Sequence, residues 1–285
     1  MSRPGTTDTR TTDSRTAEHA APGAPSQGTS ATGASRPRNA REVERAGERR
    51  ALIFQILGIA VVFAALVIWL VTADLTETEL GTLNPATLWG YTLEHLALTA
   101  VSALIVLAIA IPLGILLTRP ALRFLTGPVM TVANIGQAAP AIGLIVLLAF
   151  WLGFGFWAAI VSLVLYAVLP VLRNTMVGLT QVDDSLIEAG RGMGMSATAV
   201  LFRVELPLAV PLMLAGIRTA LVLLVGTATL ATFINGGGLG VLITTGVNLN
   251  LTTVLVSGSL IVALLALVID WLGRVVEYFA RPKGL

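Results

Sequence analysis

The glycine-rich stretch AGRGMGMS, residues 189–196, is the part of the chain whose composition most suggests a phosphate cradle. In the Walker pattern, a strand precedes such a loop and a lysine stands directly before its final Ser or Thr. Here Met195 precedes Ser196, and the first lysine of the chain is Lys283. The sequence therefore argues against nucleotide binding by this chain, and it predicts no cofactor.

Arg218 and Asp270 are ionisable residues within long apolar runs. A charged residue inside a membrane is a functional candidate by default. A structural ion pair between the two is the alternative that we favour. A membrane-embedded enzyme would need further paired ionisable groups at that depth, and only these two residues qualify.

Asn134 and Gln137, beside Pro140, are uncharged polar residues within another apolar run. Such groups let a dipolar solute pass without trapping it, so both are candidates for a translocation path. An aromatic cage for a cation is a second possibility, but tryptophan at the end of a span normally anchors at the membrane interface. The tryptophans are Trp69, Trp89, Trp151, Trp157 and Trp271.

The composition indicates whether water or lipid surrounds these residues. Apolar residues make up 55% of the 285 residues, charged residues only 12%, and the mean hydropathy is +0.85. A soluble domain averages about a quarter charged residues, so the bilayer is the expected surroundings. The absence of cysteine excludes disulfides and thiolate metal sites.

Six predominantly apolar runs approach or exceed the ~20 residues that a helix needs to cross the hydrocarbon core. The sequence therefore predicts an all-α, polytopic membrane protein with six transmembrane helices. The predicted spans are Leu52–Val71, Leu93–Leu117, Val129–Leu152, Phe154–Leu172, Leu208–Phe233 and Val254–Gly273.

Basic residues are sorted between the predicted loops. The three loops assigned to the outside, residues 72–92, 153 and 234–253, contain no Lys or Arg. All basic residues except Arg218 lie in the other predicted loops and in the terminal segments, on the opposite side of the membrane. The positive-inside rule therefore predicts that both termini are cytoplasmic. The sorting also explains a pI near 9.5 without nucleic acid as a partner.

Residues 1–50 are predicted to be a disordered cytoplasmic tail, because they are rich in Thr, Ser, Gly and Pro and nearly free of large apolar groups. The acidic residues in this segment argue against a transit peptide. The run Arg41–Arg50 is read either as a solvated juxtamembrane segment or as a short helix on the membrane surface. Residues 51–285 form the predicted transmembrane domain, with a long cytoplasmic loop at 173–207.

Two short helices are predicted in this cytoplasmic loop. The stretch Asp183–Ser185 is predicted to form an N-cap, and Ser185, followed three residues later by Glu188, has the spacing of a capping box. A helix is therefore expected over residues 186–193. Ser196 is expected to cap a second helix, and Pro207 to close the loop at the membrane. The small residues, with a few Met and Leu, are typical of an adaptable contact surface.

The same loop resembles the EAA signature of ABC importer permeases, E-A-A-x3-G-x9-I-x-L-P. Gly190 replaces the second alanine and Val204 replaces the isoleucine. The residues that match the pattern or stand at its positions are Glu188, Ala189, Gly190, Gly194, Val204, Leu206 and Pro207. In that family, the loop docks in a groove of a cytosolic ATPase, so the resemblance implies that Glu188 and Gly194 shape the docking knob.

The likeness extends from about Trp89 to the last span and is closest to the osmoprotectant subgroup, which imports glycine betaine, choline, carnitine or proline betaine. It is carried by His95–Arg119, by residues 188–240 and by Ser257–Asp270. The resemblance implies a type I importer permease fold in the cell membrane. It also implies three partners: a cytosolic ABC ATPase, an extracytoplasmic solute-binding protein, and a second permease copy or paralogue. ATP hydrolysis is then expected in the ATPase, so this chain is not predicted to be an enzyme.

Polar and glycine residues near the predicted outer surface leave two interpretations open. Glu94 and His95 form either an interfacial polar pair or a contact for the binding protein. The stretch Gly236–Gly240 is either a plain turn or, by resemblance, part of the region near the outer gate. Two alternatives for the whole chain also remain: an importer permease for another small polar solute, and an ion-coupled secondary transporter, which would usually show inverted repeats.

Overall fold

The computed structural model describes residues 38–280, and it describes side chains from Gly47 onward. Contacts divide the chain into a unit from Met1 to Glu44 and a unit from Arg45 to Leu285, and the membrane-spanning helices belong to the second unit. Helix α1 begins at Arg38, so the last part of the segment predicted to be disordered is helical. The remainder of that prediction, residues 1–37, lies outside the described residues.

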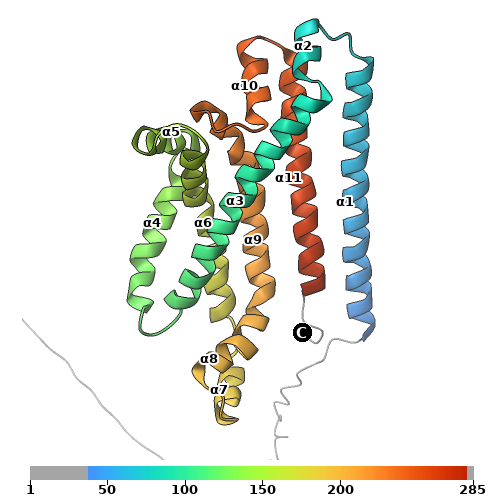
Figure 1. Ribbon diagram of the computed structural model, residues 1–285. Coiled ribbons are helices and arrows are strands. Elements are labelled where there is room, and N and C mark those ends of the chain that lie inside the picture. The colour runs from blue at the N-terminus through green and yellow to red at the C-terminus, as the bar shows by residue number, and fades with distance from the viewer. Residues whose placement is uncertain (1–37, 281–285) are drawn as a thin grey trace, which may run out of the picture. The chain divides into compact units, whose positions relative to one another are not determined.

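The described part of the chain is entirely helical, which confirms the predicted all-α class. Four long helices and several shorter ones follow α1 (Figure 1). The elements are α1 (Arg38–Thr72), α2 (Glu77–Thr82), α3 (Pro85–Leu117), η1 (Arg123–Leu125), α4 (Thr126–Ala138), α5 (Ala141–Leu152), α6 (Phe156–Thr180), α7 (Asp184–Gly192), α8 (Ala197–Val200), η2 (Leu201–Glu205), α9 (Leu206–Ala228), η3 (Thr229–Ile234), α10 (Gly240–Asn248) and α11 (Thr252–Ala280).

Within residues 38–280, five helical segments are long and apolar enough to cross a membrane, and a bent pair of helices makes a sixth if it is counted as one span. The bent pair corrects the prediction of one helix over Val129–Leu152: α4 and α5 meet at 104°. The cause is Pro140, which has no N–H to donate and disfavours helical geometry in the residue before it. Ala139 accordingly has an extended backbone, with φ −63° and ψ 142°.

Helix α3 begins eight residues before the predicted span, at Pro85 rather than Leu93. The Asn84 side chain caps it by accepting a hydrogen bond from the Thr87 N–H at 2.9 Å, and proline fits the first helical position, where no N–H is needed. The missed residues 85–92, PATLWGYT, mix Pro, Gly and Thr with apolar residues, so hydropathy alone does not mark the start of the helix.

A helical stretch also runs without interruption from Ala197 to Ile234, which corrects the prediction that Pro207 closes the loop. Pro207 is the second residue of α9, which directly follows the π-helical turn η2 (Leu201–Glu205), and the helix continues through it. The π-helical turn η2 joins α8 to α9. Movements of the loop can therefore pass directly into a membrane-spanning helix.

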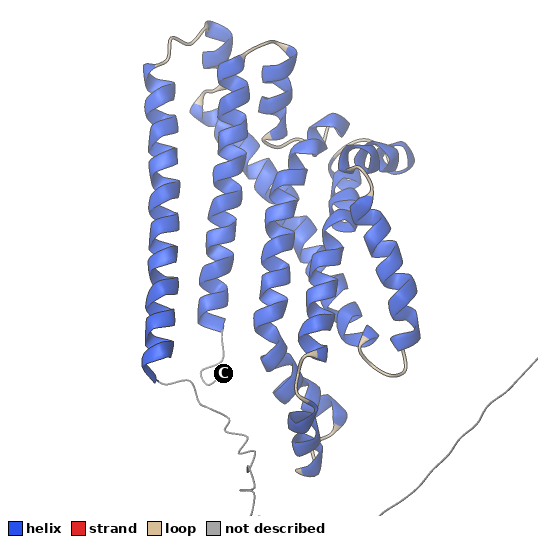
Figure 2. Cartoon of the chain, turned by 180° about the vertical axis from the view of Figure 1, so that it is seen from behind, coloured by secondary structure: helices blue, strands red, loops and turns tan. Residues whose placement is uncertain are grey.

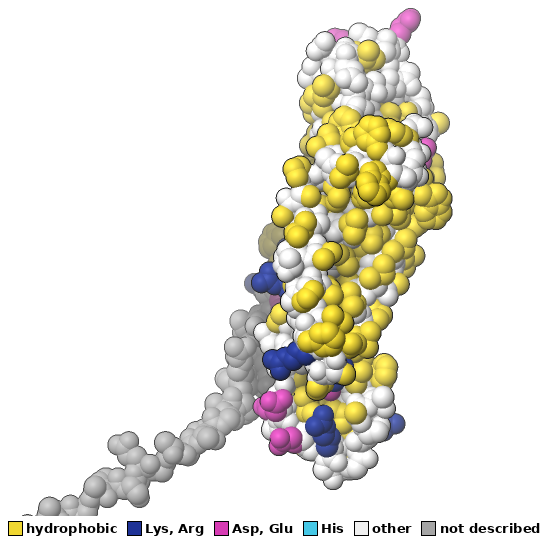
Figure 3. Space-filling view, turned by 90° about the vertical axis from the view of Figure 1, so that its left-hand side faces the viewer, with side chains coloured by type: hydrophobic (Ala, Val, Ile, Leu, Met, Phe, Trp, Pro, Cys, Tyr) yellow, Lys and Arg dark blue, Asp and Glu magenta, His cyan; other side chains and the backbone are white. Residues whose placement is uncertain are grey.

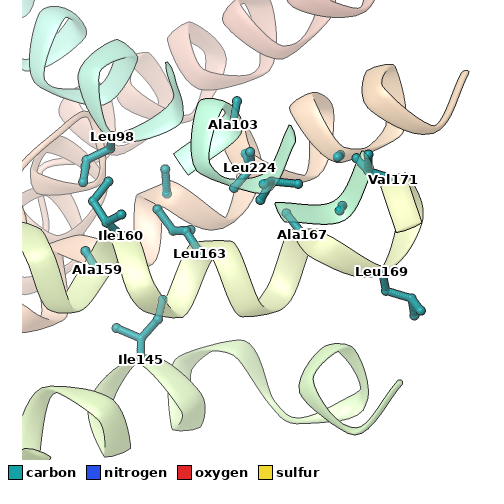
Figure 4. Packing of buried hydrophobic residues seen from close by; sticks show 14 of the residues in the cluster. Leu98, Ala103, Ile145, Ala159, Ile160, Leu163, Ala167, Leu169, Val171 and Leu224 are labelled. Carbon is teal, nitrogen blue, oxygen red and sulfur yellow. The ribbon is translucent and has the colours of Figure 1, made fainter. Parts of the chain in front are cut away.

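Helix α6 packs between α3 and α9, and the main core cluster forms along it (Figure 4). Leu98, Leu163 and Leu224 come from these three helices and are fully buried. Gly216 lets α9 approach α6 so closely that a Cβ there would lie 2.8 Å from the Pro170 carbonyl oxygen. Close packing between small residues is the usual attraction between helices in lipid.

Helix α1 packs on α11 through Ile59, Leu66 and Leu264. Two polar contacts reinforce this pairing: Trp271 Nε1 donates to the Leu52 carbonyl oxygen at 3.0 Å, and Gln55 Nε2 donates to Asp270 Oδ2 at 3.0 Å. In Figures 1 and 2, the start of the span in α1, the end of α11 and the α7–α8 segment lie toward one end of this unit. Helices α2 and α10 lie at the other end.

Candidate functional site: the α7–α8 knob

Asp183 determines where α7 begins. Its side chain accepts a hydrogen bond from the Ser185 N–H at 2.9 Å, and the same bond holds the pKa of Asp183 below its ordinary value. The cap thus lies within the predicted stretch Asp183–Ser185, but the predicted capping box of Ser185 with Glu188 is wrong, because Asp183 is the N-cap residue. Glu188 instead lies within α7 and is exposed, as is Ala189 beside it.

Gly194 produces the turn after α7, with a φ of +82°. This left-handed conformation costs a residue with a Cβ about 1–2 kcal/mol, which is a physical reason for glycine at the position. Gly190, by contrast, is buried against α8, where a Cβ would lie 3.4 Å from Val200 Cγ2. That distance is ordinary contact, so the alanine of the EAA pattern would fit here.

Ser196 caps α8 as predicted, since its side chain accepts a hydrogen bond from the Ala199 N–H at 3.2 Å. The chain then passes through η2, where Val204 is half-buried and Glu205 is buried. Leu206 and Pro207 follow as the first residues of α9. Residues 184–200, which we call the α7–α8 knob, thus extend beyond the transmembrane helices (Figure 2).

Glu205 is a residue that sequence reasoning missed. It occupies the unspecified position of the signature, between Val204 and Leu206, so the pattern carries no signal for it. Its carboxylate is held by Arg119, just after α3: Nη1 donates to Oε1 at 3.1 Å, and Nη2 pairs with Oε2. Only 7% of the Glu205 side chain is exposed. This two-bond geometry makes an arginine–carboxylate pair both strong and directional.

A cleft of about 730 Å³ lies between α7 and the turn after α3. Glu188, Asp184 and Arg191 line it from α7, and Arg123 lines it from η1. Figure 3 shows charged side chains gathered toward this end, below a flank covered by hydrophobic side chains. The polar lining of the cleft is suited to contact with a protein surface that carries both signs of charge.

Arg218 lies in a charged cluster that joins α9 to α11. Its Nε is 3.5 Å from Asp270 Oδ1, and its Nη1 is 2.9 Å from Glu277 Oε2. Arg274 Nε also bonds Asp270, at 2.9 Å. The structure therefore brings Arg218 and Asp270 together, within a larger network. Arg274 stands at the i,i+4 spacing from Asp270 that predicts a helical ion pair, whereas the contact between Arg218 and Glu277 depends on how α9 packs on α11.

Asn134 and Gln137 lie on the last turns of α4, one turn apart, before the break at Pro140. Asn134 is exposed and Gln137 is half-buried.

At the opposite end from the knob, Glu94 Oε2 accepts a hydrogen bond from the Gly238 N–H at 2.9 Å. His95 is fully buried, and its Nε2 lies 3.0 Å from the Val225 carbonyl oxygen. Glu94 therefore contacts the stretch Gly236–Gly240, the glycine-rich loop at this end, and His95 contacts α9.

Trp69, Trp89, Trp151 and Trp157 are exposed, and no ring pair among the described residues joins two tryptophans. Trp271 instead bonds α1. Within residues 38–280, no group of three or more His, Asp or Glu side chains is arranged to hold a metal ion.

Comparisons with known proteins agree with this geometry. Residues 110–281 match the family described as "Binding-protein-dependent transport system inner membrane component". The glycine betaine/carnitine/choline transport system permease protein OpuCB of Bacillus subtilis (strain 168) is 41% identical over 192 residues, covering 67% of this chain and 88% of that protein. The osmoprotectant import permease protein OsmW of Salmonella typhimurium is 37% identical over 207 residues, covering 71% and 95%.

A solved chain of the MetNI methionine ABC transporter, in an inward-facing conformation, has a TM-score of 0.62 and 26% sequence identity. The match covers 73% of this chain and all of that one. The family match includes both the knob and the helices that carry it. The chain therefore belongs to the family of binding-protein-dependent transport system inner membrane components, as a multi-pass membrane protein with the fold of an ABC importer permease.

Proposed function

We propose that this chain is the membrane-spanning permease subunit of an ATP-driven importer for a small osmoprotectant such as glycine betaine, choline or carnitine. The family supports a role in transport, and the names of OpuCB and OsmW support the class of solute. The single observation that carries the coupling role is the α7–α8 knob, which presents Glu188 on an exposed helix and is continuous with α9.

The knob is the proposed docking point of a cytosolic ABC ATPase. Leu186 and Met193, around α7, and Phe202, in η2, are exposed apolar residues, with Met193 73% exposed. Exposed apolar groups beyond the transmembrane helices are typical of an interface with another protein. The sorting of arginines supports a cytoplasmic position for this end and for both termini.

Two further partners complete the proposed transporter. A solute-binding protein would deliver the solute at the α2–α10 end, and a second permease, either a copy or a paralogue, would complete the path. Substrate and ATPase then have to bias the same two arrangements of the helices, which is the requirement for alternating access.

Asn134 and Gln137 are the proposed polar lining of the path, because they lie beside the break between α4 and α5. Alanine at both positions should reduce uptake while ATPase binding stays unchanged, since both residues lie in the last turns of α4 and do not line the cleft beside α7. Arg218 and Asp270 are proposed as a structural pair, because Glu277 and Arg274 also bond them.

Reconstituted vesicles containing this chain, its ATPase and its binding protein test the proposal. Uptake of radiolabelled glycine betaine, choline or carnitine should require ATP and the ATPase. ATP-dependent uptake of another small polar solute alone would retain the permease role and overturn the substrate class. Uptake that follows an ion gradient without the ATPase would instead favour the secondary transporter.

A further inference from the structure

Polar contacts join α3 to the chain segment that contains α9 at both ends of the transmembrane region. At the knob end, Arg119 binds both carboxylate oxygens of Glu205. At the other end, Glu94 accepts a hydrogen bond from Gly238, and His95 contacts the Val225 carbonyl oxygen. Helix α9 has 23 residues, so these contacts are roughly 35 Å apart at 1.5 Å per residue.

Glu205 is well placed to respond to movement of the knob. It is the last residue of the π-helical turn η2, and π turns inside helices occur frequently at functional sites. The Arg119 guanidinium contacts both carboxylate oxygens of Glu205, a geometry that fixes orientation as well as distance. A rotation of α7 and α8 about η2 must therefore either move the end of α3 or break this pair.

The helices between the two ends are packed too closely to absorb such a movement. A Cβ at Gly114 of α3 would lie 2.8 Å from Thr175 Cγ2 of α6. A Cβ at Gly178 of α6 would lie 3.1 Å from the Ala209 carbonyl oxygen of α9. Packed helices of this kind move as units rather than deforming continuously.

The outer end of α3 directly contacts the glycine-rich loop. Gly237 has a φ of +80°, and a Cβ there would lie 2.6 Å from Glu94 Oε2. The Glu94 carboxylate therefore rests against the backbone of this loop as well as accepting the Gly238 N–H. A shift of α3 along or across α9 would strain or release this contact.

We propose that Arg119 and Glu205 are positioning residues that transmit movement of the α7–α8 knob to α3, and through Glu94 to the Gly236–Gly238 loop at the opposite end. The proposal rests on the proposed function, because the ATPase supplies the movement. It assigns energy coupling to a pair of residues outside the specified positions of the EAA signature.

The chain contains no cysteine, so spin labels can be attached to cysteines introduced at two chosen positions. Ala86 on α3 and Asn248 on α10 are both exposed. Electron spin resonance would measure the distance between labels at A86C and N248C in the reconstituted complex, before and after trapping the ATPase with ATP and vanadate. Co-purification of the ATPase would be measured on the same samples.

The unsubstituted pair should show a distance change on trapping. This change should be lost in R119M/E205L, which removes both charges and so leaves no buried carboxylate without a partner. It should return in the exchanged pair R119E/E205R. Arg173→Ala is the matched control, because Arg173 is an exposed arginine of α6 that does not line this cleft; it should leave the change intact.

Loss in R119M/E205L with the ATPase still bound, and recovery in the exchanged pair, would support the proposal. A full distance change in R119M/E205L would overturn the role of this pair and leave the proposed function standing. Failure of the ATPase to bind the unsubstituted chain would overturn both.

Discussion

Gly194 has a backbone conformation that only glycine adopts without cost, and the space around it is open. Gly194→Ala should therefore change the turn of the knob without a steric clash. A penalty of about 1–2 kcal/mol would weaken ATPase binding by roughly 5- to 30-fold. The measurement is a titration of the ATPase into the reconstituted chain.

Gly192→Ala is the matched control for this prediction. Gly192 lies two residues earlier, ends α7, and is equally open, but it does not have a left-handed φ. Its substitution should leave the affinity within about twofold, because helix propensity favours alanine. Equal affinities for the two variants would show that the conformation of Gly194 does not shape the docking surface.

Asp183 makes the start of α7 sensitive to acid. The Ser185 N–H holds its pKa below the ordinary value. Folding of α7 therefore gains stability from the ionised carboxylate above about pH 4, the ordinary range of aspartate. This gain is lost as the pH falls through the lower folded pKa.

Hydrogen exchange in α7 can measure this effect as protection factors between about pH 5 and pH 3. Protection should fall with acid in the unsubstituted chain more than in Asp183→Asn, since asparagine caps a helix without titrating. The same pH dependence in both proteins would remove Asp183 as its cause.

The sequence predicts some residues of the candidate site and misses others. The EAA spacing identified the exposed Glu188 and the turn at Gly194, because both occupy specified positions of the pattern. Glu205 was missed since its partner, Arg119, is 86 residues away in the chain. Such a pairing depends on how α3 packs against the start of α9, which spacing within one segment does not reveal.

At the scale of elements, the crossing of α6 and α9 depends on Gly216. A Cβ there would lie 2.5 Å from Asn174 Cβ, which is closer than real Cβ contacts allow. Gly216→Ala should destabilise the protein by about 1–3 kcal/mol through overpacking. Thermal unfolding in detergent should show a lower Tm.

Gly226→Ala is the control on the same helix, because a Cβ there would meet nothing within 4 Å. It should leave the Tm unchanged or raise it slightly, as alanine is the better helix former. A Tm for Gly216→Ala equal to that of the control would mean that α6 and α9 can separate without cost.

Apolar runs predicted the number and order of the spans well, but not their breaks. Pro112, Pro170 and Pro211 all lie inside helices, whereas the helix breaks at Pro140. Hydropathy does not distinguish these prolines, because all four lie in apolar runs. The start of α3 at Pro85 and the continuity of α8 with α9 were also missed, since neither is marked by a change in hydropathy.

At the scale of the whole molecule, the region similar to known permeases is flanked by a helix that lies outside the family match. That match begins at residue 110, whereas α1 ends at Thr72. Helix α1 is nevertheless held to α11 by Gln55 and Trp271. Composition predicted α1 as a membrane span, but its partner could be identified only from the fold.

We propose that the α7–α8 knob lies inside the cell and binds an ATPase. Labelling of Met193→Cys with a membrane-impermeant maleimide tests it most directly, since Met193 is exposed and the chain has no other cysteine. Inverted vesicles should be labelled and intact cells should not, and saturating ATPase should protect the site. Labelling of intact cells, or labelling unchanged by the ATPase, would contradict the account.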